Sequence, residues 1–90
     1  MVRHSILLEV MLMKIAREPR HWHGRVPMHC HCCAEPITDA FSDFAVCNGV
    51  WMLGCDACVA EYTRYPDKPY GVGRGQRYKR DGAVWIKTAG

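Results

Sequence analysis

The 90-residue sequence predicts one small α+β domain, on three observations. Apolar residues recur at helical spacing near its start. Two turn dipeptides, Asn48-Gly49 and Asp81-Gly82, lie between apolar runs, as they do in β-hairpins. Cysteines form two Cys-x-x-Cys pairs in the middle of the chain. A chain of this length has room for a single hydrophobic core.

The first expected element is an apolar helix within residues 1–20, centred on residues 5–17. Pro19 follows as a stop signal. Five apolar side chains form a stripe at helical spacing: Leu7, Leu8, Met11, Leu12 and Ile15. Other apolar residues lie off this stripe, so the helix must bury more than one face. It does so within its own domain, in a homodimer formed through residues 5–17, or against a partner.

A hairpin is expected over residues 41–54, with a two-residue turn at Asn48-Gly49. Such a turn places Val46 opposite Trp51 and Phe44 opposite Leu53, with all four on one buried face. A helix is then expected from about Cys55 to Tyr65, where Pro66 ends it. Residues 28–66 would form the core of the domain.

Residues 67–90 are expected to form a basic loop and a second hairpin, over residues 76–88, that turns at Asp81-Gly82 and sets Tyr78 opposite Trp85. Seven basic and two acidic residues occur from 62 to 90, whereas 30–61 carry five acidic residues and no Lys or Arg. An aromatic pair framed by cations is a candidate surface for nucleic acid or a partner. Its residues are Arg74, Arg77, Tyr78, Lys79, Arg80, Trp85 and Lys87. The alternative is that Trp85 belongs to the core and the cations form a solvated rim.

Metal chemistry is indicated by Cys30-His-Cys-Cys33 and Cys55-Asp-Ala-Cys58, which are separated by 21 residues. Two cysteines three positions apart on a tight turn can direct both sulfurs at one ion about 2.3 Å away, and a second pair completes a tetrahedron. The spacing therefore predicts one structural zinc ion held by Cys30, Cys33, Cys55 and Cys58.

A turn, a hairpin and a helix N-terminus around such a site resemble the treble-clef arrangement of zinc-binding domains. The run Cys30-x-x-Cys33-x-x-Pro36-Ile37, with Cys55-x-x-Cys58 opening a helix, is similar to the zinc finger of DksA/TraR-type transcription regulators, small bacterial, plasmid or phage proteins that bind RNA polymerase. The resemblance covers about thirty residues and implies the same four zinc ligands. This chain lacks the long coiled coil with an acidic tip that precedes the finger in those proteins, so only the ligands are carried over.

Other donors leave alternatives open. Cys32, His29 or His31 can replace one of the four ligands, since all three lie beside or within the first pair. Cys47 is expected to be a small apolar residue within the sheet, with a ligand or redox role as the alternative.

The pattern argues against an enzyme. Four thiolates leave no open position on the metal for water, and the His-x-Glu and Pro-Cys-x-x-Cys motifs of zinc deaminases are absent. Two functions remain: a regulator that binds nucleic acid or the transcription machinery, and an adaptor or inhibitor, like those of phages or mobile elements, that docks on a larger host complex. No small-molecule substrate or membrane is expected as a partner. With no apolar run of about 18 residues and no secretory cleavage site, the expected location is cytoplasmic.

Overall fold

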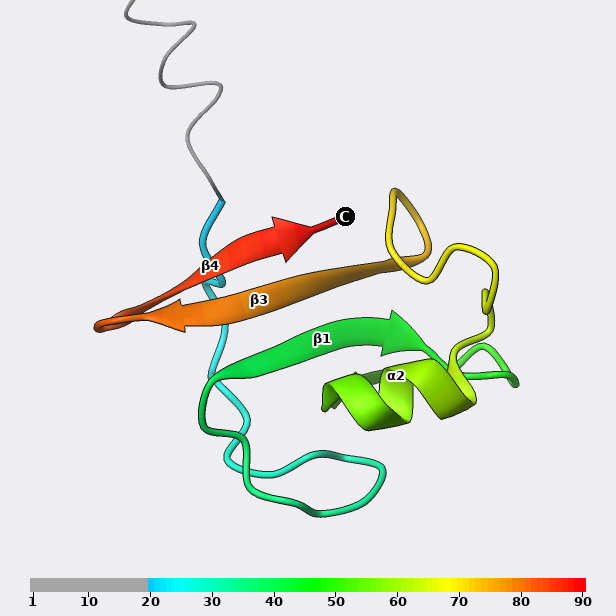
Figure 1. The fold of residues 1–90 in the computed structure, drawn as a ribbon, viewed down its shortest axis with the longest axis horizontal. Coiled ribbons are helices and arrows are strands. Elements are labelled where there is room, and N and C mark those ends of the chain that lie inside the picture. Colours follow the sequence, from blue (N-terminus) through cyan, green and yellow to red (C-terminus); the bar gives the residue numbers. More distant parts are fainter. Residues whose placement is uncertain (1–19) are drawn as a thin grey trace, which may run out of the picture.

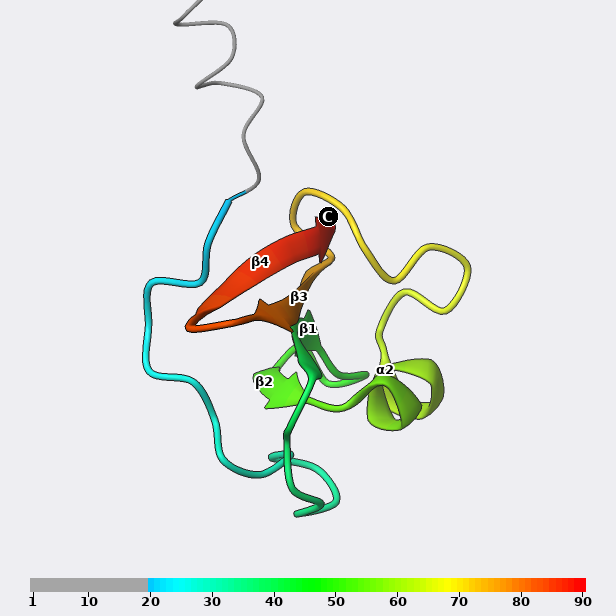
Figure 2. The same cartoon turned by 60° about the vertical axis from the view of Figure 1, so that its left-hand side comes forward.

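The computed structural model describes residues 20–90, so the helix expected over residues 5–17 lies outside the described residues. The described chain forms one helix and a four-stranded antiparallel sheet with the strand order β2-β1-β3-β4 (Figure 1, with β2 labelled in Figure 2). The elements are β1 Ala40–Ala45, β2 Trp51–Gly54, α2 Asp56–Tyr62, β3 Gly75–Asp81 and β4 Val84–Ala89. The α+β class is confirmed for this part of the chain.

Strand β1 lies inside the sheet and is covered on both faces. The helix α2 packs on one face, and the segment 20–29 runs along the opposite face (Figure 2). Phe41 and Phe44 are three positions apart in β1, so their side chains point to opposite faces. Both are fully buried. Each face of the sheet therefore has its own small core.

The core beneath α2 is built around Phe44 and contains two of the paired cysteines. Cys30, Cys58 and Val59 are buried against Phe44, with less buried apolar side chains around them. These side chains are Ile37, Val46, Met52 and Tyr70. The cysteine-rich centre and the hydrophobic core are thus one structure.

The opposite face is aromatic. The ring of Phe41 lies 5.2 Å from that of Trp22, 5.5 Å from Tyr78 and 5.3 Å from Trp85, between ring centroids. The Trp22 N–H donates to the Trp85 carbonyl at 2.8 Å, so the segment before the sheet pairs with the outer edge of β4. Trp85 is a partly buried core residue, which agrees with the alternative kept for it above.

The first hairpin forms where expected, but its register differs by one residue. Phe44 lies opposite Met52, not Leu53, because the loop has three residues, Cys47 to Gly49. The Gly49 N–H donates to the Val46 carbonyl at 2.8 Å, and Gly49 adopts a positive φ of 88°. A turn followed by a left-handed glycine is the common three-residue hairpin loop.

This shift moves side chains between faces, since neighbouring residues of a strand point in opposite directions. Trp51 and Leu53 share the face of Phe41 and not that of Phe44, so the expected common face was wrong. The expectation that Cys47 lies in the sheet was also wrong: it is an exposed loop residue.

In the second hairpin, the loop is Gly82–Ala83, one residue later than expected. Trp85 therefore lies opposite Arg80, and Tyr78 lies opposite Lys87. A displacement of two residues in the pairing leaves each side chain on its expected face. Tyr78 and Trp85 still share a face, although they are not direct partners.

Helix α2 ends at Tyr62, earlier than expected and four residues before Pro66. Thr63 has extended backbone angles, and its hydroxyl accepts a hydrogen bond from the Tyr65 N–H at 3.1 Å. The Arg64 N–H donates to the Ala45 carbonyl at 2.8 Å. A local turn at Thr63 and a hydrogen bond from Arg64 to the sheet thus end the helix before proline is reached. Within residues 20–90, no helix has the length and apolar character needed to cross a membrane.

Candidate metal centre

The two cysteine pairs meet at one place beneath the sheet. The Sγ atoms of Cys30, Cys33, Cys55 and Cys58 all lie within 4.8 Å of one another. Sulfurs placed tetrahedrally about 2.3 Å from an ion are separated by about 3.8 Å. The Sγ atoms of Cys33 and Cys55 are 3.8 Å apart. Four thiols with this spacing can hold one metal ion.

The first pair lies on a tight turn that precedes β1. The Ala34 N–H donates to the Cys30 carbonyl at 2.9 Å, and the Cys30 N–H donates to the Glu35 carbonyl at 2.8 Å. Ala34 adopts a positive φ of 65°, which turns the chain back on itself. The local backbone therefore directs the first two sulfurs into the same space.

The second pair joins the end of β2 to α2. Cys55 is the N-cap of α2, and Cys58 lies on the buried side of its first turn, next to Val59. The Cys55 N–H donates to the Cys30 Sγ at 3.3 Å, and the Cys32 N–H donates to the same sulfur at 3.4 Å. These bonds connect the two pairs and stabilise negative charge on Cys30.

The thiols differ in acidity. Burial acts to raise the pKa of Cys30, but hydrogen bonds from the backbone N–H groups of Cys33, Cys55 and Cys32 together lower it to about 6. Burial and the neighbouring sulfurs raise the pKa of Cys58 well above its usual range. A group of thiols in which one ionises readily and another resists suits a cation, whose charge would stabilise all four thiolates.

The alternative donors near the first pair make other contacts. The Cys32 thiol donates to the Met52 Sδ at 3.3 Å. The His31 Nδ1 accepts a hydrogen bond from the Leu53 N–H at 3.2 Å, and His29 bridges Pro36 through the backbone. Within residues 20–90, none of these three donors joins the group of four sulfurs.

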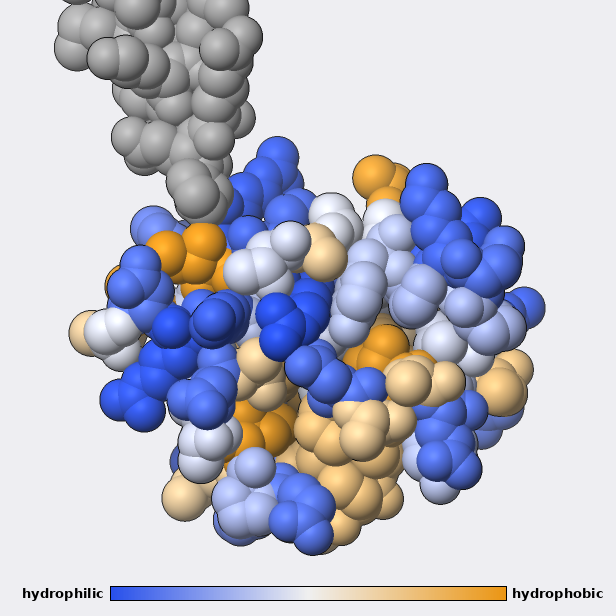
Figure 3. Space-filling model, in the orientation of Figure 1, coloured by the Kyte–Doolittle hydropathy of each residue, from blue (hydrophilic) through white to orange (hydrophobic). Residues whose placement is uncertain are grey.

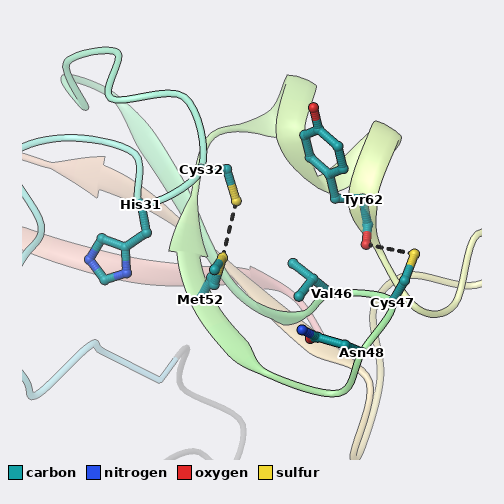
Figure 4. A pocket seen from close by; sticks show the side chains of 7 residues that line it. All are labelled: His31, Cys32, Val46, Cys47, Asn48, Met52 and Tyr62. Carbon is teal, nitrogen blue, oxygen red and sulfur yellow. Dashed lines mark hydrogen bonds between the residues drawn. The ribbon is translucent and has the colours of Figure 1, made fainter.

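A mostly apolar pocket of about 430 Å³ lies next to this centre, and sequence reasoning missed it. Figure 4 shows Cys32 and Met52 on one side of it and Tyr62 and Cys47 on the other, with the His31 ring turned away from Cys32. The Cys47 thiol donates to the Tyr62 carbonyl at 3.5 Å. No sequence signal pointed to this pocket, because it depends on the unexpected three-residue loop.

The seven residues expected to bind nucleic acid or a partner do not form one surface. Tyr78 and Trp85 pack around Phe41. Arg77 points towards α2, where it forms an ion pair with Asp56. Of the other four residues, Arg74 lies over the Tyr65 ring, Lys79 and Arg80 are exposed, and Lys87 is partly buried.

Burial raises the pKa of Tyr78, with the nearby Asp43 carboxylate adding to the effect.

On the face shown in Figure 3, hydrophilic residues gather over the β3–β4 hairpin, while a more apolar area lies over α2 and the cysteine turn. The hydrophilic surface of the β3–β4 hairpin and the apolar surface over α2 and the cysteine turn are therefore separate.

Comparison of the chain with protein families, curated proteins and solved structures gives no significant match. No comparison supports the similarity to the DksA/TraR-type finger, which stays a prediction from the four cysteines and Pro36-Ile37.

Proposed function

We propose that this chain is a non-enzymatic module that binds one structural zinc ion through Cys30, Cys33, Cys55 and Cys58. The observation that carries the proposal is the clustering of their four sulfurs within 4.8 Å. A tetrahedral set of four thiolates selects zinc or iron, and zinc sites of this composition are structural. The metal content of protein purified in the presence of both zinc and iron tests the choice between them. One zinc per chain is expected, and iron in its place would refute the assignment of zinc.

The position of the site supports a structural role. It joins three parts of the chain, the turn at residues 30–33, the end of β2 and the start of α2. We take this as a treble-clef-like arrangement. All four coordination positions would be filled by sulfur, which leaves none for a substrate or an activated water.

The function that we favour for this module is regulation through binding to nucleic acid. Arg20, Arg25, Lys79 and Arg80 are exposed, and within the described part of the chain none of them forms an ion pair. The Lys87 N–H donates to the Arg20 carbonyl at 2.7 Å, which brings the segment before the sheet next to the basic hairpin. Exposed cations that form no ion pair suit phosphate groups.

The mode of binding differs from the first expectation. Because Tyr78 and Trp85 pack on Phe41, the second hairpin offers bases no free aromatic pair to stack on, and its contacts would be mainly electrostatic. Fluorescence anisotropy with short oligonucleotides should then give a log–log salt slope of about −3, from three or four phosphate contacts. The double variant Lys79→Gln/Arg80→Gln should reduce that slope, whereas Lys68→Gln, outside the β3–β4 hairpin, should not. No binding at tens of micromolar protein would reject this function.

A second candidate, docking on a protein complex, is favoured by a different observation. Val50, Trp51 and Tyr62 are 49%, 46% and 47% exposed, and they come from the first hairpin and the end of α2. Tyr62 also lines the apolar pocket. Apolar side chains of this kind suit a protein partner. Binding that is insensitive to salt and is lost in Tyr62→Ala, but not in Lys79→Gln/Arg80→Gln, would identify this function instead.

A further inference from the structure

Arg77 connects the C-terminal hairpin to the metal centre. Its guanidinium donates two hydrogen bonds to the Asp56 carboxylate, from Nε to Oδ1 and from Nη2 to Oδ2, both at 2.9 Å. Its Nη1 also donates to the Thr88 hydroxyl at 3.2 Å. Arginine and carboxylate in this two-point geometry are held in orientation as well as in distance.

Asp56 is placed where such a contact affects the ligands. It follows Cys55 directly and lies in the first turn of α2, two residues before Cys58. A shift of Asp56 would therefore shift both sulfurs of the second pair. Arg77, by contrast, belongs to β3, whose pairing with β1 at Ser42 fixes its backbone.

We propose that Arg77 is a positioning residue for the metal centre: it holds the Cys55-Asp-Ala-Cys58 turn against the sheet and so couples metal binding to the β3–β4 hairpin. This inference rests on the proposed zinc site. Groups outside the ligand shell that orient the ligands are known to tune metal affinity. The third contact, with Thr88 of β4, extends the connection across the hairpin.

The positive charge of Arg77 also affects the electrostatics of the proposed zinc site. A zinc ion with four thiolates has a net charge of −2, and the Asp56 carboxylate adds another negative charge beside it. The guanidinium offsets that addition while it fixes the turn. Geometry and charge make different predictions for Arg77→Lys, which keeps the charge but loses the two-point contact.

The test measures the zinc dissociation constant of the full chain by competition with a chromophoric chelator, for the wild type, Arg77→Lys, Arg77→Gln and Lys68→Gln. Loss of a partly exposed two-point pair should weaken zinc binding about 5-fold in both Arg77 variants. Lys68→Gln, which removes an exposed cation elsewhere, should bind zinc as the wild type does. A contact that stabilised apo and zinc-bound protein equally would leave the dissociation constant unchanged.

Hydrogen exchange of the unmodified protein gives an independent readout that needs no variant. Removal of zinc should speed exchange of the β3 and β4 amides as well as those near the cysteines. Wild-type affinity in Arg77→Lys, or unchanged exchange of β3 and β4 on zinc removal, would overturn the coupling while leaving the zinc site intact. A wild-type chain that binds no metal would overturn both proposals.

Discussion

Substitution of Gly54 by alanine tests how closely the metal centre and the hydrophobic core are packed. Gly54 is the buried last residue of β2, directly before the second cysteine pair. A Cβ atom there would lie 2.8 Å from Cε1 of Phe44 and 3.3 Å from Sγ of Cys30. The first distance is shorter than real Cβ contacts allow, so the ring or the strand must move.

The cost of Gly54→Ala can be estimated from this geometry. Its φ lies outside the left-handed region, so the backbone itself tolerates alanine and the cost is steric. Insertion of a methyl group into a packed core costs about 1–3 kcal/mol, and we expect about 2 kcal/mol here. In a domain of this size, that loss corresponds to a fall in melting temperature of about 10 °C. Zinc affinity should fall too, because the second neighbour of the new methyl group is a ligand sulfur.

The assay is denaturant unfolding of the zinc-loaded protein at fixed free zinc, with Phe44→Leu as the matched second variant. Leucine removes the ring edge that the new methyl group meets, so Phe44→Leu should cost less in the Gly54→Ala background than alone. The expected coupling is on the order of 1 kcal/mol. Unchanged stability of Gly54→Ala, or strictly additive effects of the two substitutions, would refute the packing described here.

Three further predictions concern the ligands and the aromatic core. Serine at any of the four proposed ligands should lower zinc affinity by more than about 100-fold, since loss of a group that hydrogen-bonds a ligand directly already costs about 10–100-fold. Zinc content should stay near one per chain in Cys32→Ser and Cys47→Ser, and loss of zinc in Cys32→Ser alone would show that the first pair is wrongly assigned. Trp85→Ala should destabilise the protein by about 3 kcal/mol, because the side chain packs on Phe41; an unchanged melting temperature would contradict its place in the core. Burial raises the pKa of Tyr78, so the neutral side chain should stabilise the protein fully below the ordinary tyrosine pKa of about 10, and this contribution should be lost as the pH rises through the folded-state pKa. The difference in 295 nm absorbance between the wild type and Tyr78→Phe should show this late ionisation. Titration of Tyr78 at the ordinary pKa would contradict it.

The grouping of the four cysteines could be predicted from the sequence because its geometry is local. Each Cys-x-x-Cys pair lies on a few consecutive residues, and the hairpin between the pairs has its own turn signal at Asn48-Gly49. The grouping of the four sulfurs therefore follows from the two Cys-x-x-Cys pairs and the hairpin that connects them. Neither pattern requires knowledge of distant contacts.

The register of each hairpin could not be predicted in the same way. Asn-Gly and Asp-Gly dipeptides serve both two-residue and three-residue loops, and the choice depends on which side chains the sheet buries. In the first hairpin the three-residue loop places Met52 beside Phe44, in the core with Cys30 and Cys58.

The surroundings of Tyr78 and Trp85 in the second hairpin also depend on contacts that the local pattern does not reveal. The aromatic face of this hairpin is covered by Trp22, which is more than fifty residues away in the sequence and pairs with the edge of β4. From the sequence, Arg77 is expected to be a free cation, but in the fold it forms an ion pair with Asp56. Long-range contacts of this kind have no signal in the local pattern.

Native mass spectrometry of the purified chain tests the central claim most directly. We predict a mass equal to the chain plus one zinc, with the cysteine protons displaced by the metal, and a return to the metal-free mass after treatment with a strong chelator. A chain that carries no metal, or that carries two disulfides among Cys30, Cys33, Cys55 and Cys58, would contradict the account.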